Sequence, residues 1–495
     1  MLDIFKVALE YHRPLSREAS TIQKFLPTLP LALPACVISV LISACGGGGG
    51  GSSTPVVSTP VSTPTTGVAD CGVESQKSFV LAVAQDWYLW FDELANVDAA
   101  DFASAEAYLV ALTAPLAEDF RDPGFSYLTT AAEDEANFTN AAFVGFGFRF
   151  AIDDSGRYLI SDAFEGAPAA SAGLQRGAEI LAVDSGDGFI TMQDYEAQGV
   201  GLDQIFGEAE IGVERGFRIR RDGETLDLII TKDELSIPPM ANAPRLLERP
   251  GLSPVAYIHL RNFTLSAEPE LEAAFAELRD RSVTDFLIDL RYNGGGLVDV
   301  ANRFLDLLGG IIADNNTAYE VTHNVKRASE NRSYQFNNRS NSASPIRIAF
   351  ITSGATASAS ELMINSLEPF VDVVLIGEDT TGKAVGQYAF DQRNCDTRLR
   401  IVAFESVNGE GFGGYYTGLV DTGRFTLCPV EDSYTGAFGS RDDPLTAGAL
   451  AWLNEGSCAA PVNVSSTRTA AKGLPRSQTV KPSYDRPDRR SLWIQ

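Results

Sequence analysis

Histidine is scarce in this chain, with three residues among 495. His12 lies near the N-terminus, His259 lies in an apolar run that predicts a strand, and His323 lies in a polar stretch. The chain also lacks a G-x-S-x-G sequence, which forms the strained nucleophile turn of α/β hydrolases. A Ser-His-Asp triad would have to recruit His259 or His323, and neither stands beside a recognisable serine motif. The scarcity argues against hydrolytic chemistry that depends on histidine.

Basic residues are also few. Lys and Arg total 39 against 65 Asp and Glu, which gives a formal net charge of −26. Nucleic-acid-binding surfaces need clustered Lys and Arg, so this balance argues against a nucleic-acid partner. No C-x-x-C spacing occurs among the six cysteines, so a structural zinc site is not expected. Neither a metal nor an organic cofactor is implied.

One long apolar run is present near the N-terminus. Residues 25–44 carry no charge and end in Ser43-Ala44 before Cys45. Prolines make the first half of this run a poor membrane helix. Small residues before a cysteine at the end of an apolar run resemble a bacterial lipoprotein signal, so we expect residues 1–45 to be that signal and Cys45 to carry the lipid. An uncleaved anchor and a soluble export signal are the alternatives.

A linker follows the expected lipid site. Residues 46–70 begin with six consecutive glycines and continue with Ser, Thr and Pro, a composition typical of flexible or extended tethers. A tether directly after a lipidated Cys45 would hold a folded domain away from a bilayer. The expected location is therefore the bacterial cell envelope, on the periplasmic side, with the membrane as a partner through the lipid anchor.

Four cysteines remain beyond the linker. They are Cys71, Cys395, Cys428 and Cys458. An even number in an exported chain favours two disulfides. We expect a local pair between Cys395 and Cys428, with Cys71 and Cys458 joining the two ends of the folded region. Four buried free thiols are the alternative.

The rest of the chain changes character in four steps. Residues 71–140 have apolar residues at helical spacing and predict a helical N-terminal domain. Residues 141–235 carry short β-rich runs, and residues 236–458 alternate strands with helices, which favours a largely parallel sheet with crossover helices. Residues 459–495 are polar and predict a disordered tail. The expected fold class is multidomain α/β, or α+β overall.

The β-rich region resembles a PDZ domain of the protease-associated type. Gly145-Phe146-Gly147-Phe148 matches that family's carboxylate-binding loop, whose glycines let backbone amides point at a ligand carboxylate. The following strand could accept an extended peptide by β-augmentation. Ala178 departs from the resemblance, because the family commonly has Asp there. A generic small β domain is the alternative.

Three strand-end segments carry candidate chemistry. They are DLRYNGGG at 289–296, TSGATASASEL at 352–362 and GEDTTGKAVGQ at 377–387. Taken singly, each has an ordinary explanation: a glycine turn after a strand, serines that cap a helix, and a solvated lysine. The lysine becomes a candidate base only if it is buried and neutral.

In this order and spacing the three segments resemble the catalytic region of the tail-specific, or C-terminal processing, serine peptidases. Ser358 precedes Lys383 by 25 positions, and Gln387 follows Lys383 by 4. These separations match the family's nucleophile, general base and base-orienting glutamine. They also select Ser358 over Ser360 as the nucleophile.

The resemblance implies a serine endopeptidase with a Ser-Lys dyad. Lys383, held by Gln387, would remove the proton from Ser358, which would form an acyl-enzyme. The amides of Gly296 and Ala359 would stabilise the oxyanion. The substrates would be proteins or peptides with accessible C-termini.

Two residues of the lysine segment depart from the resemblance. Ala384 follows the lysine where the family often has Gly, and Gly386 stands where an aliphatic residue is usual. The geometry of the lysine loop therefore stays open. Two rivals also stay open: a non-proteolytic relative that serves as a PDZ scaffold or binds a hydrophobic ligand, and a Ser-His hydrolase that uses His259. The oligomeric state is not predicted.

Overall fold

The computed structural model describes residues 71–153, 155–281 and 283–458. The expected lipoprotein signal with Cys45, the linker and the C-terminal tail lie outside these described residues. Among the described residues, no helix combines the length and apolar character needed to cross a membrane.

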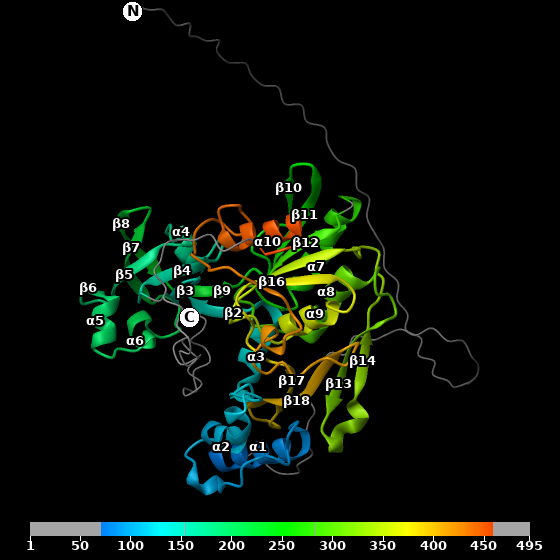
Figure 1. Cartoon of the computed structure of the whole chain (residues 1–495). Coiled ribbons are helices and arrows are strands. Elements are labelled where there is room, and N and C mark those ends of the chain that lie inside the picture. The colour runs from blue at the N-terminus through cyan, green and yellow to red at the C-terminus, as the bar shows by residue number, and fades with distance from the viewer. Residues whose placement is uncertain (1–70, 154, 282, 459–495) are drawn as a thin grey trace, which may run out of the picture. The chain divides into compact units, whose positions relative to one another are not determined.

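The N-terminal part is helical, as predicted (Figure 1). Its main elements are α1 (Val73–Trp87), α2 (Ala105–Glu118), the short strand β1 (Tyr127–Thr129) and α3 (Ala131–Asn140). Ser104 caps α2 by accepting from the Ala107 N–H, and Thr130 with Glu133 forms a capping box at the start of α3. Just after α1, the Leu89 N–H donates to the Val402 carbonyl, which ties this part to a strand far along the chain.

An antiparallel sheet follows, here called the upstream sheet. Its strand order is β3-β4-β5-β7-β8, with β6 paired to β5. The strands are β3 (Phe148–Ile152), β4 (Tyr158–Ala163), β5 (Glu179–Asp184), β6 (Phe189–Thr191), β7 (Glu214–Arg221) and β8 (Glu224–Thr231). The short helices are α4 (Pro168–Ser171), α5 (Met192–Ala197) and α6 (Leu202–Phe206). A separate ladder joins β2 (Ala142–Gly145) to β9 (Asp233–Ser236). The core of the upstream sheet is aromatic and contains Phe146, Phe148, Phe206 and Phe217.

A six-stranded sheet forms the centre of the C-terminal part. Its order is β10-β11-β12-β15-β16-β19, and every pairing from β11 to β19 is parallel. The strands are β10 (Arg245–Arg249), β11 (Leu252–His259), β12 (Asp285–Asp289), β15 (Arg347–Thr352), β16 (Asp372–Gly377) and β19 (Leu427–Pro429). The predicted, largely parallel sheet is therefore confirmed, with one antiparallel edge strand, β10.

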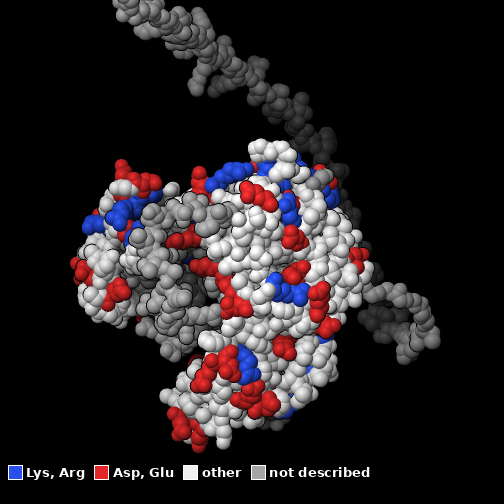
Figure 2. All heavy atoms as spheres, viewed as in Figure 1, with Lys and Arg blue, Asp and Glu red and all other residues white. Residues whose placement is uncertain are grey.

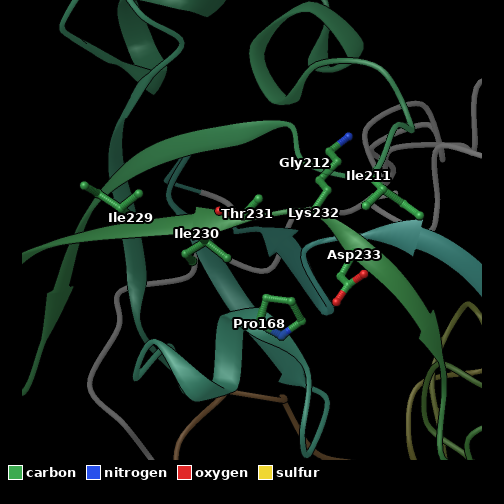
Figure 3. Close-up of a pocket in the computed structure, with 8 residues that line it drawn as sticks. All are labelled: Pro168, Ile211, Gly212, Ile229, Ile230, Thr231, Lys232 and Asp233. Carbon is green, nitrogen blue, oxygen red and sulfur yellow. The ribbon is translucent and has the colours of Figure 1, made fainter.

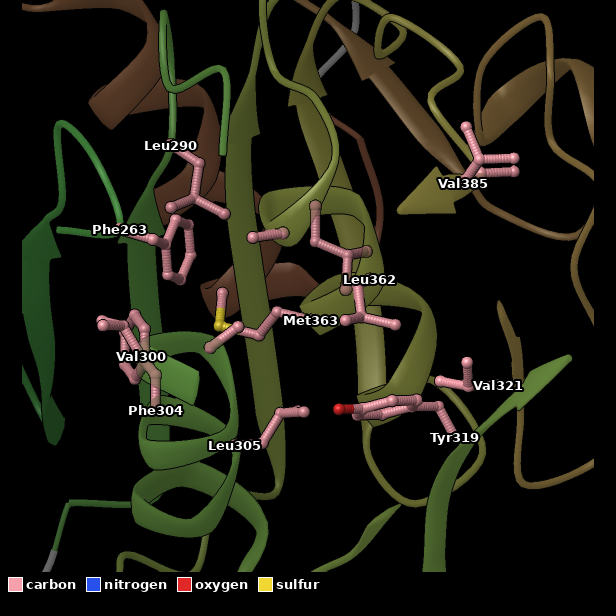
Figure 4. Close-up of a cluster of buried hydrophobic side chains, with 14 of the residues drawn as sticks. Phe263, Leu290, Val300, Phe304, Leu305, Tyr319, Val321, Leu362, Met363 and Val385 are labelled. Atoms are coloured by element: carbon pink, nitrogen blue, oxygen red, sulfur yellow. The ribbon is translucent and has the colours of Figure 1, made fainter. Parts of the chain in front are cut away.

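Helices cover both faces of this sheet. They are α7 (Ala267–Leu278), α8 (Val298–Gly309), α9 (Ala359–Leu367) and α10 (Pro444–Glu455). Along β12, Phe286 and Ile288 pack with α7, α8 and α9, whereas Leu287 faces the opposite side and packs with α10. This alternation is the period of a strand buried on both faces. Figure 4 shows the first side, where Phe304 of α8 and Met363 of α9 meet.

A second sheet, which is antiparallel, was not predicted. Its order is β1-β18-β13-β14, and β17 also pairs with β18. The remaining strands are β13 (Thr317–His323), β14 (Arg332–Gln335), β17 (Val385–Asp391) and β18 (Arg398–Asn408). β1 comes from the N-terminal part, and β17 begins within the lysine segment. Because both pair with β18, this sheet joins the two regions.

The two disulfides join the four expected cysteines, but the predicted pairing is wrong. The bonds are Cys71–Cys395 and Cys428–Cys458. Cys71 stands at the start of α1, which lies beside the turn between β17 and β18 that holds Cys395. Cys458 follows α10, which packs on the sheet whose edge strand β19 contains Cys428. Packing across the sheets, which sequence spacing does not reveal, decides the partners.

The face of the molecule seen in Figure 2 is rich in acidic side chains. They are spread over this face, and the basic side chains form small groups among them. The view agrees with the net charge of −26. On this face there is no continuous basic stripe of the kind that recognises nucleic acid.

Candidate active site

The candidate site lies where β12 and β15 end. Their carboxyl ends meet at one edge because the two strands are parallel. The loop after β12 and the turn before α9 bond directly, since the Asn293 carbonyl accepts from the Ala357 N–H at 3.1 Å and from the Ser360 hydroxyl at 3.1 Å. The fold therefore joins two of the three segments that the sequence singled out.

Ser358 stands at the start of α9 in a strained backbone conformation. Its φ and ψ are 57° and −115°, a region that non-glycine residues rarely adopt. Strain of this kind persists only where the surrounding structure enforces it, and it clusters at functional sites. Ser358 is half-buried, whereas Ser360 is fully buried and its hydroxyl is bonded to Asn293. Of the two serines, Ser358 is the one that a substrate could reach.

The glycine loop lies directly against Ser358. A Cβ atom on Gly295 would lie 2.7 Å from the Ala357 carbonyl oxygen, 2.8 Å from the Ala359 nitrogen and 2.9 Å from the Ser358 Cβ. The φ of Gly295 is also positive, at 97°. Sequence reasoning assigned the neighbouring Gly296 and missed the role of Gly295, which only the approach of α9 reveals.

The two amides expected to form the oxyanion site have no acceptor among the described residues. Within the described part of the chain, no acceptor is bonded to the N–H of Gly296 or of Ala359. The Gly295 N–H, by contrast, is occupied by the Asn293 side-chain oxygen at 2.9 Å. Unpaired amides beside a strained serine are the donors that a developing oxyanion requires.

Replacing Gly295 with alanine should lower kcat by about 100-fold, because the new methyl group would push against the serine and the Ala359 amide. Steady-state cleavage assays would measure the loss. Gly294→Ala is the matched control, since a Cβ there meets no atom within 4 Å. Equal activity in the two variants would contradict the geometry.

Lys383 and Gln387 are brought together by the turn into β17. The Lys383 ammonium donates to the Gln387 side-chain oxygen at 2.5 Å. The Gln387 side-chain nitrogen donates in turn to the Phe125 carbonyl, also at 2.5 Å. The Phe125 ring centroid lies 5.0 Å from the Lys383 nitrogen. Phe125 comes from the N-terminal part, and sequence reasoning did not find it.

Glu361 joins the serine segment to the lysine segment. One carboxylate oxygen accepts from the backbone N–H groups of Ser358, at 2.8 Å, and of Lys383, at 2.9 Å. The other accepts from the Gly382 N–H at 2.7 Å. Sequence reasoning missed this residue, although its place three positions after a helix-capping serine is the signal of a capping box. Glu361 fixes the two segments relative to each other.

Burial raises the pKa of Glu361 to about 7, against hydrogen bonds from Thr380, Gly382, Ser358 and Lys383 that lower it. The folded state therefore keeps a proton that the unfolded state releases near the ordinary value of 4.5. The stability that this proton contributes is present below that value and is lost as the pH rises through about 7.

Glutamine does not titrate, so we expect the free energy of unfolding of the Glu361→Gln variant not to fall in this way as the pH rises. Between pH 5 and pH 8 the wild type should lose on the order of 2–3 kcal/mol relative to the variant. Chemical denaturation of both proteins at the two pH values would measure it. Parallel pH dependences would contradict the proton assignment.

Neither of the two described histidines is placed to act as a general base for a serine. Burial, with the positive charge of Arg261, holds the pKa of His259 well below its usual value, and its ring packs edge-on against Phe438. His323 bonds instead to the Tyr388 hydroxyl, at 2.9 Å, and to Asn331. Among the described residues, no serine is hydrogen-bonded to either histidine ring.

A buried ion pair and two hydrogen bonds connect the upstream region to the C-terminal part. The Arg261 guanidinium binds Asp162 of β4 through two hydrogen bonds, at 2.8 and 3.0 Å. Arg149 of β3 donates to the Tyr292 carbonyl at 3.4 Å, and Arg176 donates to the Tyr292 hydroxyl at 3.2 Å. Removing either Arg261 or Asp162 would leave a buried charge, so this pair holds the upstream sheet to the segment after β11. The two bonds to Tyr292 hold the same region to the glycine loop.

The expected carboxylate-binding loop connects β2 to β3. Phe146 and Phe148 are buried in the aromatic core, so only the backbone of the loop could meet a ligand. Gly147 has a φ of 86°, and a Cβ there would lie 2.2 Å from the Ala167 Cβ. β3 ends the strand order of the upstream sheet, so its outer edge makes no ladder within that sheet.

A pocket of about 430 Å³ lies near this loop. Pro168, Ile211 and Ile229 are among its lining residues (Figure 3). Lys232 also lines it; its ammonium donates to the Gly207 and Glu208 carbonyls at 2.8 and 2.9 Å. Because that charge already binds the protein, the pocket offers a ligand apolar side chains together with the hydroxyl of Thr231 and the carboxylate of Asp233.

Comparisons with known proteins agree with these elements. Residues 254–411 match the model of peptidase family S41, and residues 75–127 match that of the peptidase S41 N-terminal domain. A solved structure from Bacteroides fragilis that carries the S41 protease name has a TM-score of 0.62 at 23% identity, covering 80% of this chain and all of that one. This likeness establishes the fold.

The curated relatives match part of this chain and part of their own length. The carboxyl-terminal-processing protease of Synechocystis sp. is 26% identical over 296 residues, which cover 59% of this chain and 63% of that protein. The chloroplastic carboxyl-terminal-processing peptidase 2 of Arabidopsis thaliana is 28% identical over 244 residues, covering 47% of this chain and 43% of that protein. The match thus covers less than two thirds of either relative.

Proposed function

We propose, from the membership of this chain in peptidase family S41, that it is a serine endopeptidase that cleaves proteins near their C-termini. The observation that carries the proposal is the joint placement of Ser358 and Lys383. Their backbone N–H groups share one buried carboxylate oxygen of Glu361, and Gln387 holds the lysine side chain.

The chemistry follows from this arrangement. Lys383 takes the proton of the Ser358 hydroxyl as its oxygen attacks the substrate carbonyl carbon. The carbonyl oxygen becomes an oxyanion, which the amides of Gly296 and Ala359 stabilise. The C–N bond breaks, Lys383 returns the proton to the leaving amine, and an acyl ester remains on Ser358. Water then attacks the ester and regenerates the serine.

The proposed recognition of substrates uses the upstream sheet. A C-terminal tail would pair with the outer edge of β3, and the amides of residues 145–148 would bind its terminal carboxylate. The unpaired edge of β3 and the positive φ of Gly147 support this assignment. The hydrogen bond from Arg149 to Tyr292 of the glycine loop and the Arg261–Asp162 ion pair would keep the bound tail near the site.

An unstructured polypeptide with an apolar C-terminus tests the proposed function. We expect the free acid to be cleaved with a kcat/KM about tenfold above that of the C-terminal amide, because the amide removes a charged acceptor. N-terminal acetylation of the same substrate should change nothing. Equal cleavage of acid and amide would contradict carboxylate recognition. Binding of the tail without any cleavage would favour a PDZ scaffold.

We also propose that the protein is held at the bacterial envelope by a lipid on Cys45. The apolar run ending at this cysteine and the Gly-rich linker after it support the proposal. Labelling with a radioactive fatty acid should mark the wild type and spare Cys45→Ser. Labelling of both proteins would contradict the proposal.

A further inference from the structure

The loop between α2 and β1 reaches Lys383, the proposed general base of the candidate site. Its residues 122–126 lie at the end of the segment that matches the S41 N-terminal domain. Phe125 is 6% exposed, so its side chain is buried against the rest of the protein. The loop thus brings a residue of the N-terminal part to Lys383 and Gln387, which lie more than 250 positions further along the chain.

Phe125 contacts both Lys383 and Gln387. Its carbonyl accepts from the Gln387 side-chain nitrogen at 2.5 Å, and its ring centroid lies 5.0 Å from the Lys383 ammonium. The Lys383 ammonium itself donates to the Gln387 oxygen at 2.5 Å. The three groups therefore form a closed set in which each contacts the other two.

Other contacts fix this loop. The Asp122 side chain is fully buried and accepts from the Ser126 N–H at 3.0 Å, from the Ser126 hydroxyl at 2.6 Å and from the Tyr88 hydroxyl at 3.1 Å. The Ser126 hydroxyl oxygen in turn accepts from the Val402 N–H of β18 at 3.0 Å. A loop held by a buried carboxylate and by a strand is a rigid support.

We propose that Phe125 is a positioning residue for the base, so that the N-terminal part completes the active site; this inference rests on the proposed function. A carbonyl can only accept, so the Phe125 carbonyl requires the nitrogen of the Gln387 amide to face it. The Gln387 oxygen must then face Lys383. The orientation of the glutamine is thereby set from the N-terminal part.

The Phe125 ring adds an electrostatic contribution. Lys383 gains positive charge when it takes the proton of Ser358, and an aromatic face within about 6 Å of an ammonium stabilises that charge. Because the charge develops on the way to the transition state, the ring favours the transition state over the ground state. The expected result of losing it is a lower kcat with little change in KM.

Phe125→Ala in the full chain tests the inference, with an unstructured polypeptide ending in an apolar residue as substrate. The substitution keeps the backbone carbonyl of Phe125 but removes the buried ring that packs the loop and faces Lys383, so the carbonyl is no longer held in place. We expect kcat to fall about 30- to 100-fold and KM to change less than twofold. Phe102→Ala is the matched control. Phe102 is also an N-terminal-part phenylalanine whose carbonyl accepts from a buried lysine, Lys77, and whose ring packs on an aromatic residue. That variant should keep the wild-type kcat.

Two further variants separate positioning from folding. Phe125→Leu keeps apolar bulk without an aromatic face, and we expect its kcat to fall only three- to fivefold. In a Gln387→Ala background, Phe125→Ala should cost much less than it does alone, because the two residues act on one lysine. Additive effects, or a wild-type kcat in Phe125→Leu, would overturn the inference.

The failure of this inference can be told from the failure of the proposed function. If Ser358→Ala still cleaves the substrate, the proposed function is wrong whatever Phe125 does. If Ser358→Ala is inactive and Phe125→Ala has the wild-type kcat, only the role of Phe125 is wrong.

Discussion

Replacing Ser358 with alanine is expected to lower the kcat for an unstructured substrate by about 10⁴- to 10⁶-fold, the range seen when a nucleophile is removed from a catalytic unit. The variant retains the glycine loop and the amides of Gly296 and Ala359, so it should still bind substrate. We therefore expect KM, or the dissociation constant measured on the inactive protein, to stay near the wild-type value. Product formation followed by mass spectrometry would measure both.

Ser360→Ala is the matched control for that loss. Ser360 lies two positions away on the same helix, but it is fully buried and its hydroxyl serves the Asn293 carbonyl. Its removal should cost about 1–3 kcal/mol of stability and leave most of the activity. If Ser360→Ala were inactive and Ser358→Ala active, the nucleophile would be the other serine.

Replacing Lys383 with arginine is expected to lower kcat by about 10³- to 10⁴-fold. Arginine keeps the positive charge and could still donate to the Gln387 oxygen, but it does not give up a proton at any pH that proteins tolerate. A base is therefore lost while charge and bulk are retained. Assays from pH 6 to pH 10 would follow the loss, which should not be recovered at high pH.

The same variant distinguishes a base from a structural cation. If Lys383 only supported the loop, arginine would keep most of the activity. A wild-type kcat in Lys383→Arg would therefore contradict the dyad. Unchanged thermal unfolding of the variant would show that its loss is chemical.

Local patterns in the sequence predicted the helical N-terminal part and the parallel sheet, because buried strands and amphipathic helices carry their own periodicities. They did not predict the second sheet, since its strands β1 and β18 are paired across the chain. The disulfide pairing failed for the same reason: Cys71 meets Cys395 only because α1 lies beside the β17–β18 turn.

The candidate site was predictable where it follows the order of motifs. The resemblance to the C-terminal processing peptidases, which the spacing of three motifs carries, predicted that Ser358, Lys383 and Gln387 share one site. The structure brings the Lys383 and Gln387 side chains together. Gly295 and Phe125 could not be predicted, because their importance lies in what approaches them from distant segments. One departure of the lysine segment has a structural reason. Gly386 stands where the family usually has an aliphatic residue, and a Cβ there would collide with the Phe404 ring of β18.

Covalent labelling would show whether Ser358 is the activated nucleophile. An organic fluorophosphonate transfers its phosphonyl group to an activated serine with loss of fluoride, and fragmentation of the modified peptide identifies the serine. We expect one phosphonyl group on Ser358 of the wild type and none on Lys383→Arg. Modification of Ser360 or another serine, or equal labelling of Lys383→Arg, would contradict it.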